Sequence, residues 1–172
     1  MKYLFFTVLI IPFLLSNAFC QQQVQIKQQA QISANAFVTG NYEKFSDYMY
    51  PKLIQIAGGR DSMISGIKKG VIDLNNKGII IKNVAIGEPG LVYNDGDELH
   101  CVVPETLTLK VHGGYLISKG YWLAINVNKA QIWYFIDIGN IDAEKINAMF
   151  PNLNSKIIIP EHIQPVFVKD SI

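Results

Sequence analysis

The sequence contains few cysteines and few charged residues. Of its 172 residues, two are cysteine and 17% are charged, and the formal net charge is +1. One cysteine outside the N-terminal segment excludes a disulfide scaffold and a cysteine-ligated zinc site. A near-neutral charge without a run of Lys or Arg gives no electrostatic footprint for nucleic acid, so we expect no nucleic-acid partner.

Motifs for common chemistries are also missing. The chain has no Gly-rich phosphate loop, no G-x-S-x-G and no H-E-x-x-H. NDGDE at 94–98 lacks the ligand spacing of a calcium loop and is interpreted as a solvated turn. The histidines His100, His112 and His162 are scattered, with no close carboxylate expected. We therefore expect no metal site and no cofactor.

Residues 1–20 have the pattern of a secretory signal peptide. Lys2 precedes an apolar run from Tyr3 to Leu15, which a more polar segment follows. The run is shorter than the roughly 20 residues that span a bilayer, and no later stretch approaches that length. We expect an exported protein, periplasmic or extracellular, with no transmembrane segment in the mature chain.

Cys20 allows two interpretations of the cleavage site. Cleavage after Cys20 leaves Gln21 first and a mature domain of residues 21–172, with 14 basic and 14 acidic side chains. Alternatively, Cys20 is the lipid-bearing first residue of a bacterial lipoprotein. Phe19 argues against that route, which favours a small residue before the cysteine.

Helical periodicity dominates the first half of the mature domain. Residues at helical spacing predict an amphipathic helix with glutamines on its solvent-exposed face: Ile26, Ala30, Ala34 (or Ser33) and Phe37. Asn41 is expected to cap a second helix, and Pro51 to begin a short third one. Asp61 is expected to cap a longer helix. Two glycines in that helix suggest close helix packing: Gly66 and Gly70.

From residue 79 the apolar period changes to two, which is typical of strands. The expected strands are 79–86, 99–112, 115–127 and 131–138. Turns are expected at Gly113-Gly114 and Asn128-Lys129. Asp142 is expected to cap a short helix ending at Phe150, and the tail 151–172 to add or cover an edge strand.

The turn at Gly113-Gly114 also predicts a register. A bulge at Lys119-Gly120 restores apolar pairing, and then Val103 faces Ile125 and Leu107 faces Tyr121. The opposite face is then expected to carry Val102, Trp122, Ala124, Trp133 and Phe135. Since both faces are apolar, one packs on the helices. The other needs a partner subunit, the C-terminal tail or a ligand.

Three helices followed by long antiparallel strands resemble the NTF2-like superfamily. The likeness is carried by ANAFVTGNYEKFSDYMYP, GGRDSMISGIKK and the strands ending in WYFIDIGN, which span roughly residues 25 to 140. The WYFID, FP and IPE segments are similar to the ends of exported bacterial proteins. The resemblance implies an α+β fold, with N-terminal helices on a curved antiparallel sheet in an NTF2-like or cystatin-like cone. Ketosteroid isomerase-like and polyketide cyclase-like (SnoaL-like) enzymes share this superfamily with many non-catalytic binding domains, so the fold leaves function open.

Asp137 is the only candidate for catalysis. It lies in an apolar strand in phase with Trp133, where a raised pKa would suit a general base or acid. Alternatively, it ends the strand and caps the turn at Gly139-Asn140. Glu105 either lines a pocket or forms an ion pair with Lys119.

Tyr121 and Tyr134 either donate hydrogen bonds to a ligand or belong to the core. The expected ligand-binding residues are Glu105, Tyr121, Trp133, Tyr134 and Asp137. The sequence favours a non-catalytic exported domain that binds a small apolar ligand or a protein partner, as a homodimer through its sheet. The alternative is an isomerase- or cyclase-like enzyme with Asp137 as general base.

Overall fold

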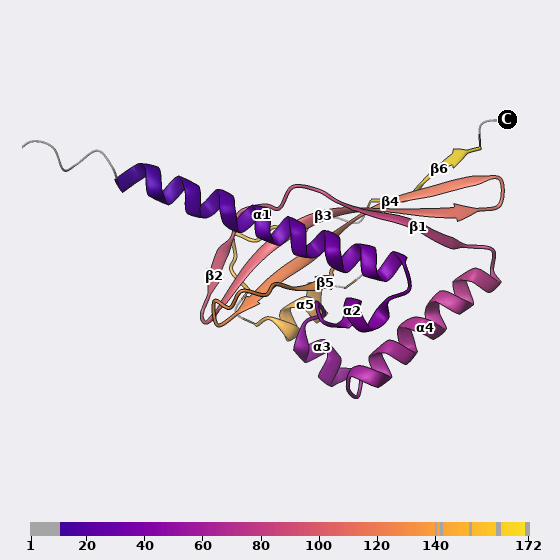
Figure 1. Cartoon of the computed structure of the whole chain (residues 1–172), viewed down its shortest axis with the longest axis horizontal. Helices are drawn as coiled ribbons and strands as arrows, with labels where there is room; N and C mark the ends of the chain where they lie inside the picture. Colours follow the sequence, from indigo (N-terminus) through magenta and orange to yellow (C-terminus); the bar gives the residue numbers. More distant parts are fainter. Residues whose placement is uncertain (1–10, 140, 142, 152, 161–162, 171–172) are drawn as a thin grey trace, which may run out of the picture.

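The computed structural model describes residues 11–139, 141, 143–151, 153–160 and 163–170. Helices pack against a curled antiparallel sheet that forms a half-barrel, which confirms the predicted α+β class (Figure 1). The elements are α1 (Ile11–Val38), α2 (Tyr42–Ser46), α3 (Pro51–Ile56), α4 (Arg60–Asn76), β1 (Ile80–Ile86), β2 (Tyr93–Asp95), β3 (Glu98–Val111), β4 (Gly114–Val127), β5 (Tyr134–Asp137), α5 (Ala143–Met149) and β6 (Val166–Lys169).

The long helix α1 lies along the sheet (Figure 1). Its predicted stripe is confirmed, because three side chains have no exposed surface: Ile26, Ala30 and Ala34. The glutamines do more than face solvent. Gln29 donates to the backbone oxygen of Gln131 at 2.9 Å and accepts from the backbone N–H of Trp133 at 2.8 Å. Amide side chains thus fix the segment that leads into β5.

The residues expected to begin the shorter helices are partly confirmed. The Asn41 side chain accepts from the backbone N–H of Lys44 at 3.1 Å, and Pro51 begins α3. The cap assigned to Asp61 is wrong, since α4 begins at Arg60 after Gly59 and has no side-chain cap. Gly59 has a φ of 103°, a conformation that glycine adopts without strain. Asp61 therefore lies in the first turn of α4, where its negative carboxylate interacts favourably with the positive end of the helix dipole.

The glycines of α4 do not mark close packing. A Cβ built on Gly66 or on Gly70 would meet no atom within 4 Å. The apolar side of α4 is only partly covered, with Ile64 buried and Ile72 exposed. The expectation of close helix contact at these glycines is therefore wrong.

The sheet follows the order β1-β3-β4-β5, with β2 against β3 and β6 against β4. β3 and β4 pair without interruption from Glu98↔Val127 to Val111↔Gly114. The hairpin turn is therefore His112-Gly113 instead of Gly113-Gly114. The predicted bulge at Lys119-Gly120 is absent from this ladder, and a register shift occurs in β1 between Ile81 and Asn83.

Gly114 is needed by a neighbouring strand. β6 pairs with the start of β4, and a Cβ on Gly114 would collide with the carbonyl oxygen of Val168 and the ring of Phe167. Gly113 has a φ of 77° and serves the turn. The two glycines therefore have different roles: Gly113 permits the turn, and Gly114 permits the close approach of β6.

The uninterrupted register changes which residues share a face. Val103 lies opposite Trp122 and Cys101 opposite Ala124, so the predicted pairing of Val103 with Ile125 is wrong. One face packs on α1 through the cluster of Ile26, Ala30, Ala34, Val84, Ile86, Cys101, Val103, Trp122, Ala124, Trp133 and Phe135. Burial raises the pKa of the Cys101 thiol to about 12, which disfavours the reactive thiolate form.

The other face is covered by the C-terminal part of the chain. Its cluster contains Leu123, Ile125, Ile136, Ile138, Ile146 and Phe150, with Leu153 and Ile159 packed against it. Among the three covers that the sequence allows, the chain's own tail thus covers the β4–β5 part of this face. Residue 142, the expected cap of α5, lies outside the described residues.

Two strand expectations need revision. The last core strand, β5, covers only 134–137 of the expected 131–138, and a strand that was not expected, β2, lies between the expected strands 79–86 and 99–112. The tail does add an edge strand, β6, as predicted. No helix in the described part of the chain has the length and apolar character needed to cross a bilayer.

Candidate functional site

An apolar pocket of about 270 Å³ is lined by residues of the helices, of the sheet and of the segments that adjoin them. Its walls are Ser33, Phe37, Phe45, Tyr48, Met49, Leu53, Val84, Glu105, Leu107, Trp122, Phe135, Ile136, Asp137 and Ile141. The set contains five aromatic side chains and two carboxylates. It contains no Lys, Arg or His.

The segment between α2 and α3 closes one side of this pocket. The backbone N–H of Phe135 donates to the carbonyl oxygen of Tyr48 at 2.7 Å, and Met49 forms an isolated bridge with Phe135. These bonds fix the segment against the edge of β5. The ring of Trp122, whose centroid lies 5.7 Å from that of Phe135, continues the wall on β4.

Glu105 is the most enclosed charged group of the pocket. It lies on β3 opposite Gly120, with 9% of its surface exposed, and its carboxylate lies where a Gly120 side chain would be. Burial, and then the nearby Asp137 carboxylate, raise the pKa of Glu105 to about 7. The expected ion pair with Lys119 is wrong. Lys119 lies opposite Thr106 and projects from the other face.

Asp137 stands at the end of β5, on the same face as Glu105. The residue keeps solvent-exposed surface, and its Oδ1 accepts from the backbone N–H of Gly139 at 2.9 Å. Partial burial raises the pKa of Asp137, and the hydrogen bond from Gly139 opposes that rise. Asp137 therefore lines the pocket and also makes the turn contact that the sequence allows.

Ser33 supplies a third polar group. It comes from α1, is 1% exposed, and its hydroxyl oxygen has no hydrogen-bond partner among the described residues. Buried polar atoms rarely stay unpaired, because the lost hydration costs about 1–3 kcal/mol. The sequence offers no signal for Ser33 beyond its place near the apolar stripe of α1.

The other expected ligand residues lie outside this pocket. Trp133 is 1% exposed and packs in the core beneath α1. Tyr121 packs with the cluster on the opposite face of the sheet. Tyr134 pairs with Ile125 and lines a separate, open hollow beside Arg60. The structure therefore joins Glu105 with Asp137 and separates both from the two tyrosines.

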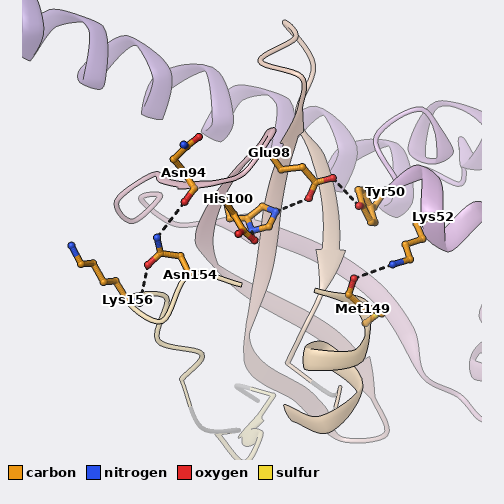
Figure 2. A network of polar contacts seen from close by, with 9 residues as sticks. Tyr50, Lys52, Asn94, Glu98, His100, Met149, Asn154 and Lys156 are labelled. Atoms are coloured by element: carbon orange, nitrogen blue, oxygen red, sulfur yellow. Dashed lines mark hydrogen bonds and ion pairs between the residues drawn. The ribbon is translucent and has the colours of Figure 1, made fainter. Parts of the chain in front are cut away.

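A second polar cluster surrounds His100 (Figure 2). His100 Nε2 lies 2.9 Å from Glu98 Oε2, and its Nδ1 lies 3.4 Å from Asp95 Oδ2. The hydroxyl of Tyr50 donates to Glu98 Oε1 at 2.9 Å. Burial, and then this bond to a carboxylate, raise the pKa of Tyr50 to about 12.

The His100 cluster connects distant segments. The ring of His100 packs edge-on against Phe150, with 5.5 Å between centroids, and Phe150 also contacts Tyr50. Asp95 and Glu98 lie directly opposite each other on β2 and β3, so the imidazole separates two like charges. The cluster therefore holds the β2–β3 hairpin, Tyr50 and Phe150 together and has a structural role.

The expectation that no histidine has a close carboxylate is wrong for His100. Glu98 and His100 are two residues apart in one strand and therefore share a face, so the sequence allowed their contact to be predicted. Asp95 comes close to His100 only because the β2–β3 hairpin folds it back onto β3. Within the described residues, no group of three potential ligands is arranged to hold a metal ion.

Comparisons with known proteins find no match to this chain among family models, curated proteins or solved structures.

Proposed function

We propose that this protein is an exported, non-catalytic domain of NTF2-like type that binds a small apolar molecule between α1, α2 and the sheet. The observation that carries the proposal is the pocket of about 270 Å³, whose lining includes five aromatic side chains and Ser33, the hydroxyl of which has no partner among the described residues. A pocket with mostly apolar walls and a few converging polar groups is the usual form of a small-molecule site.

The size of the pocket limits the ligand. An engineered apolar cavity of about 150 Å³ holds benzene, so a pocket of about 270 Å³ accommodates a larger compact body. Adamantane-sized molecules are suitable probes, because they are rigid and lose little conformational entropy on binding.

Binding of 1-adamantanol is the direct test. We expect isothermal titration calorimetry to give a Kd below about 1 mM for the wild type. Leu107→Trp places a larger ring in the pocket wall and is expected to weaken binding at least about tenfold. Leu91→Trp makes the same change at a side chain that is 68% exposed, and is expected to leave binding unchanged.

Equal affinities for the wild type and Leu107→Trp would place the ligand elsewhere. Absence of binding by the wild type would remove the proposal itself. Circular dichroism of each variant separates a filled pocket from a failure to fold.

Catalysis is the less supported alternative. An isomerase- or cyclase-like reaction needs an enclosed base with a hydrogen-bond donor nearby. Asp137 is exposed and already accepts a bond from Gly139, while Tyr121 packs on the other face of the sheet. Glu105 is better enclosed, yet it has no hydrogen-bond partner among the described residues. For these reasons we propose binding.

Export and a homodimer belong to the same proposal, and native mass spectrometry of protein from its source tests both. We expect a mass that begins at Gln21, with two copies of the chain. β6 suits such a contact, because it pairs only with β4 among the described strands and exposes Val166, Phe167 and Val168. A mass that includes the N-terminal segment would contradict cleavage after Cys20. A single copy of the chain would contradict the dimer. An added diacylglyceryl mass would support the lipoprotein alternative.

A further inference from the structure

We infer that the ligand of this pocket is an organic cation: an amine whose compact apolar body fills the aromatic space while its ammonium group lies between Glu105 and Asp137. The inference rests on the proposed binding function and adds the charge of the ligand to it. Three features of the pocket support it: its unbalanced charge, its aromatic faces and its unpaired acceptors.

The first feature is negative charge without compensation. Glu105 and Asp137 project from the same face of the sheet, and neither forms an ion pair with a described residue. Gly120 and Gly139 lie beside these two carboxylates and place no side chain next to them. A Cβ on Gly120 would collide with Glu105, and one on Gly139 would lie 3.3 Å from Asp137 Oδ1. Two neighbouring carboxylates in an apolar site attract a cation and repel an anion.

The second feature is the aromatic wall. Trp122 and Phe135 line the pocket on the strands that carry or flank the two carboxylates, and Tyr48 lies on the facing segment. The faces of such rings attract ammonium groups, and the attraction grows when the cation is removed from water. A neutral apolar ligand would use the rings but leave the charge of Glu105 without a partner.

The third feature is the supply of acceptors. The hydroxyl oxygen of Ser33 is buried and unpaired, and Glu105 is 9% exposed with no hydrogen bond to a described residue. A protonated amine is a donor without an acceptor function, so it matches this set. Bonds from an ammonium to a carboxylate are stronger than those between neutral groups.

A matched pair of probes tests the charge of the ligand. 1-Adamantylamine and 1-adamantanol have nearly the same shape and differ in a protonated amine against a hydroxyl. At about pH 8, above the pKa of about 7 that burial gives Glu105, we expect the amine to bind at least about tenfold more tightly. At about pH 5.5, where Glu105 is mostly protonated and the amine remains charged, this preference is expected to shrink to a few-fold.

Glu105→Gln identifies the responsible group. We expect it to remove most of the preference for the amine over 1-adamantanol at about pH 8. Glu144→Gln makes the same change at an exposed position of α5 and is expected to keep the full preference. Asp137→Asn, at a more exposed carboxylate, is expected to have a smaller effect than Glu105→Gln.

The outcomes separate the two proposals. If 1-adamantanol binds in the pocket and 1-adamantylamine binds no more tightly, the inferred positive charge is wrong while the proposed function stands. If the amine is preferred equally by the wild type and Glu105→Gln, the assignment to Glu105 is overturned. If 1-adamantanol does not bind the wild type, the proposed function itself fails.

Discussion

His100→Ala is expected to lower the free energy of unfolding by about 3–5 kcal/mol, which is the largest effect we predict for a single side chain. The imidazole is fully buried, packs on Phe150 and separates the carboxylates of Asp95 and Glu98. Alanine would leave a cavity in this cluster and two acidic groups facing each other across the β2–β3 hairpin. Urea denaturation followed by far-ultraviolet circular dichroism measures the change.

His112→Ala is the matched control for this prediction. His112 occupies the exposed turn between β3 and β4, so its removal is expected to change stability by less than about 0.5 kcal/mol. A loss below about 1 kcal/mol for His100→Ala would show that the cluster does not clamp the domain. Since small domains have about 5–15 kcal/mol of stability, the predicted loss is a large part of the total.

Glu105→Gln is expected to stabilise the folded protein at about pH 8 by about 2–3 kcal/mol and to have little effect near pH 4. The direction follows from the pKa of Glu105, which rises from its ordinary value of 4.5 to about 7 on folding. As the pH rises between these values, the unfolded chain releases the proton first, while the folded protein retains it. The unfolded state then binds fewer protons, so the wild type loses stability as pH increases through this window.

The magnitude is set by the size of the shift and by solvent. A shift of this size corresponds to about 3 kcal/mol, and partial access of water to the carboxylate reduces it. Glutamine has the same shape and no charge to bury, so the variant does not lose stability as the pH rises through this window. Comparing unfolding midpoints of the wild type and the variant at each pH cancels the titration of groups that do not interact with Glu105, whereas Asp137 is coupled to it.

Glu144→Gln again serves as the control, and its stability is expected to stay within about 0.5 kcal/mol of the wild type at every pH, because Glu144 is exposed and interacts only weakly with the helix dipole. A constant difference between Glu105→Gln and the wild type across the whole range would contradict the shifted pKa. A variant that is less stable than the wild type at about pH 8 would show instead that the Glu105 carboxylate has a stabilising partner in the unliganded protein.

Local sequence patterns correctly predicted most of the helices and strands. The stripe on α1, the cap at Asn41, the start of α3 at Pro51 and the long strands β3 and β4 all follow from residues close together in the chain. These features depend on backbone preference and on the period of burial, which a short window contains. The α+β class then follows from helices that precede a run of strands.

The candidate site was only half visible in the sequence. Glu105 and Asp137 were recognisable, because each is an acidic residue in an apolar strand. Their common pocket depends on the register of β3 against β4, and the predicted bulge at Gly120 placed Glu105 away from Trp122. Ser33 was recognisable only by its place near the apolar stripe of α1, since the lack of a hydrogen-bond partner for its hydroxyl is a property of the fold.

The sequence by itself determined where most strands and helices form, and that the sheet is apolar on both faces. Tertiary structure decided which glycine of the Gly113-Gly114 pair makes the turn, because β6, some fifty residues later, requires the close approach at Gly114. It also brought Asp95 to His100 through a hairpin that the alternation of residues did not indicate. Register and such long-range contacts depend on packing between distant segments, whose competing alternatives differ little in local energy.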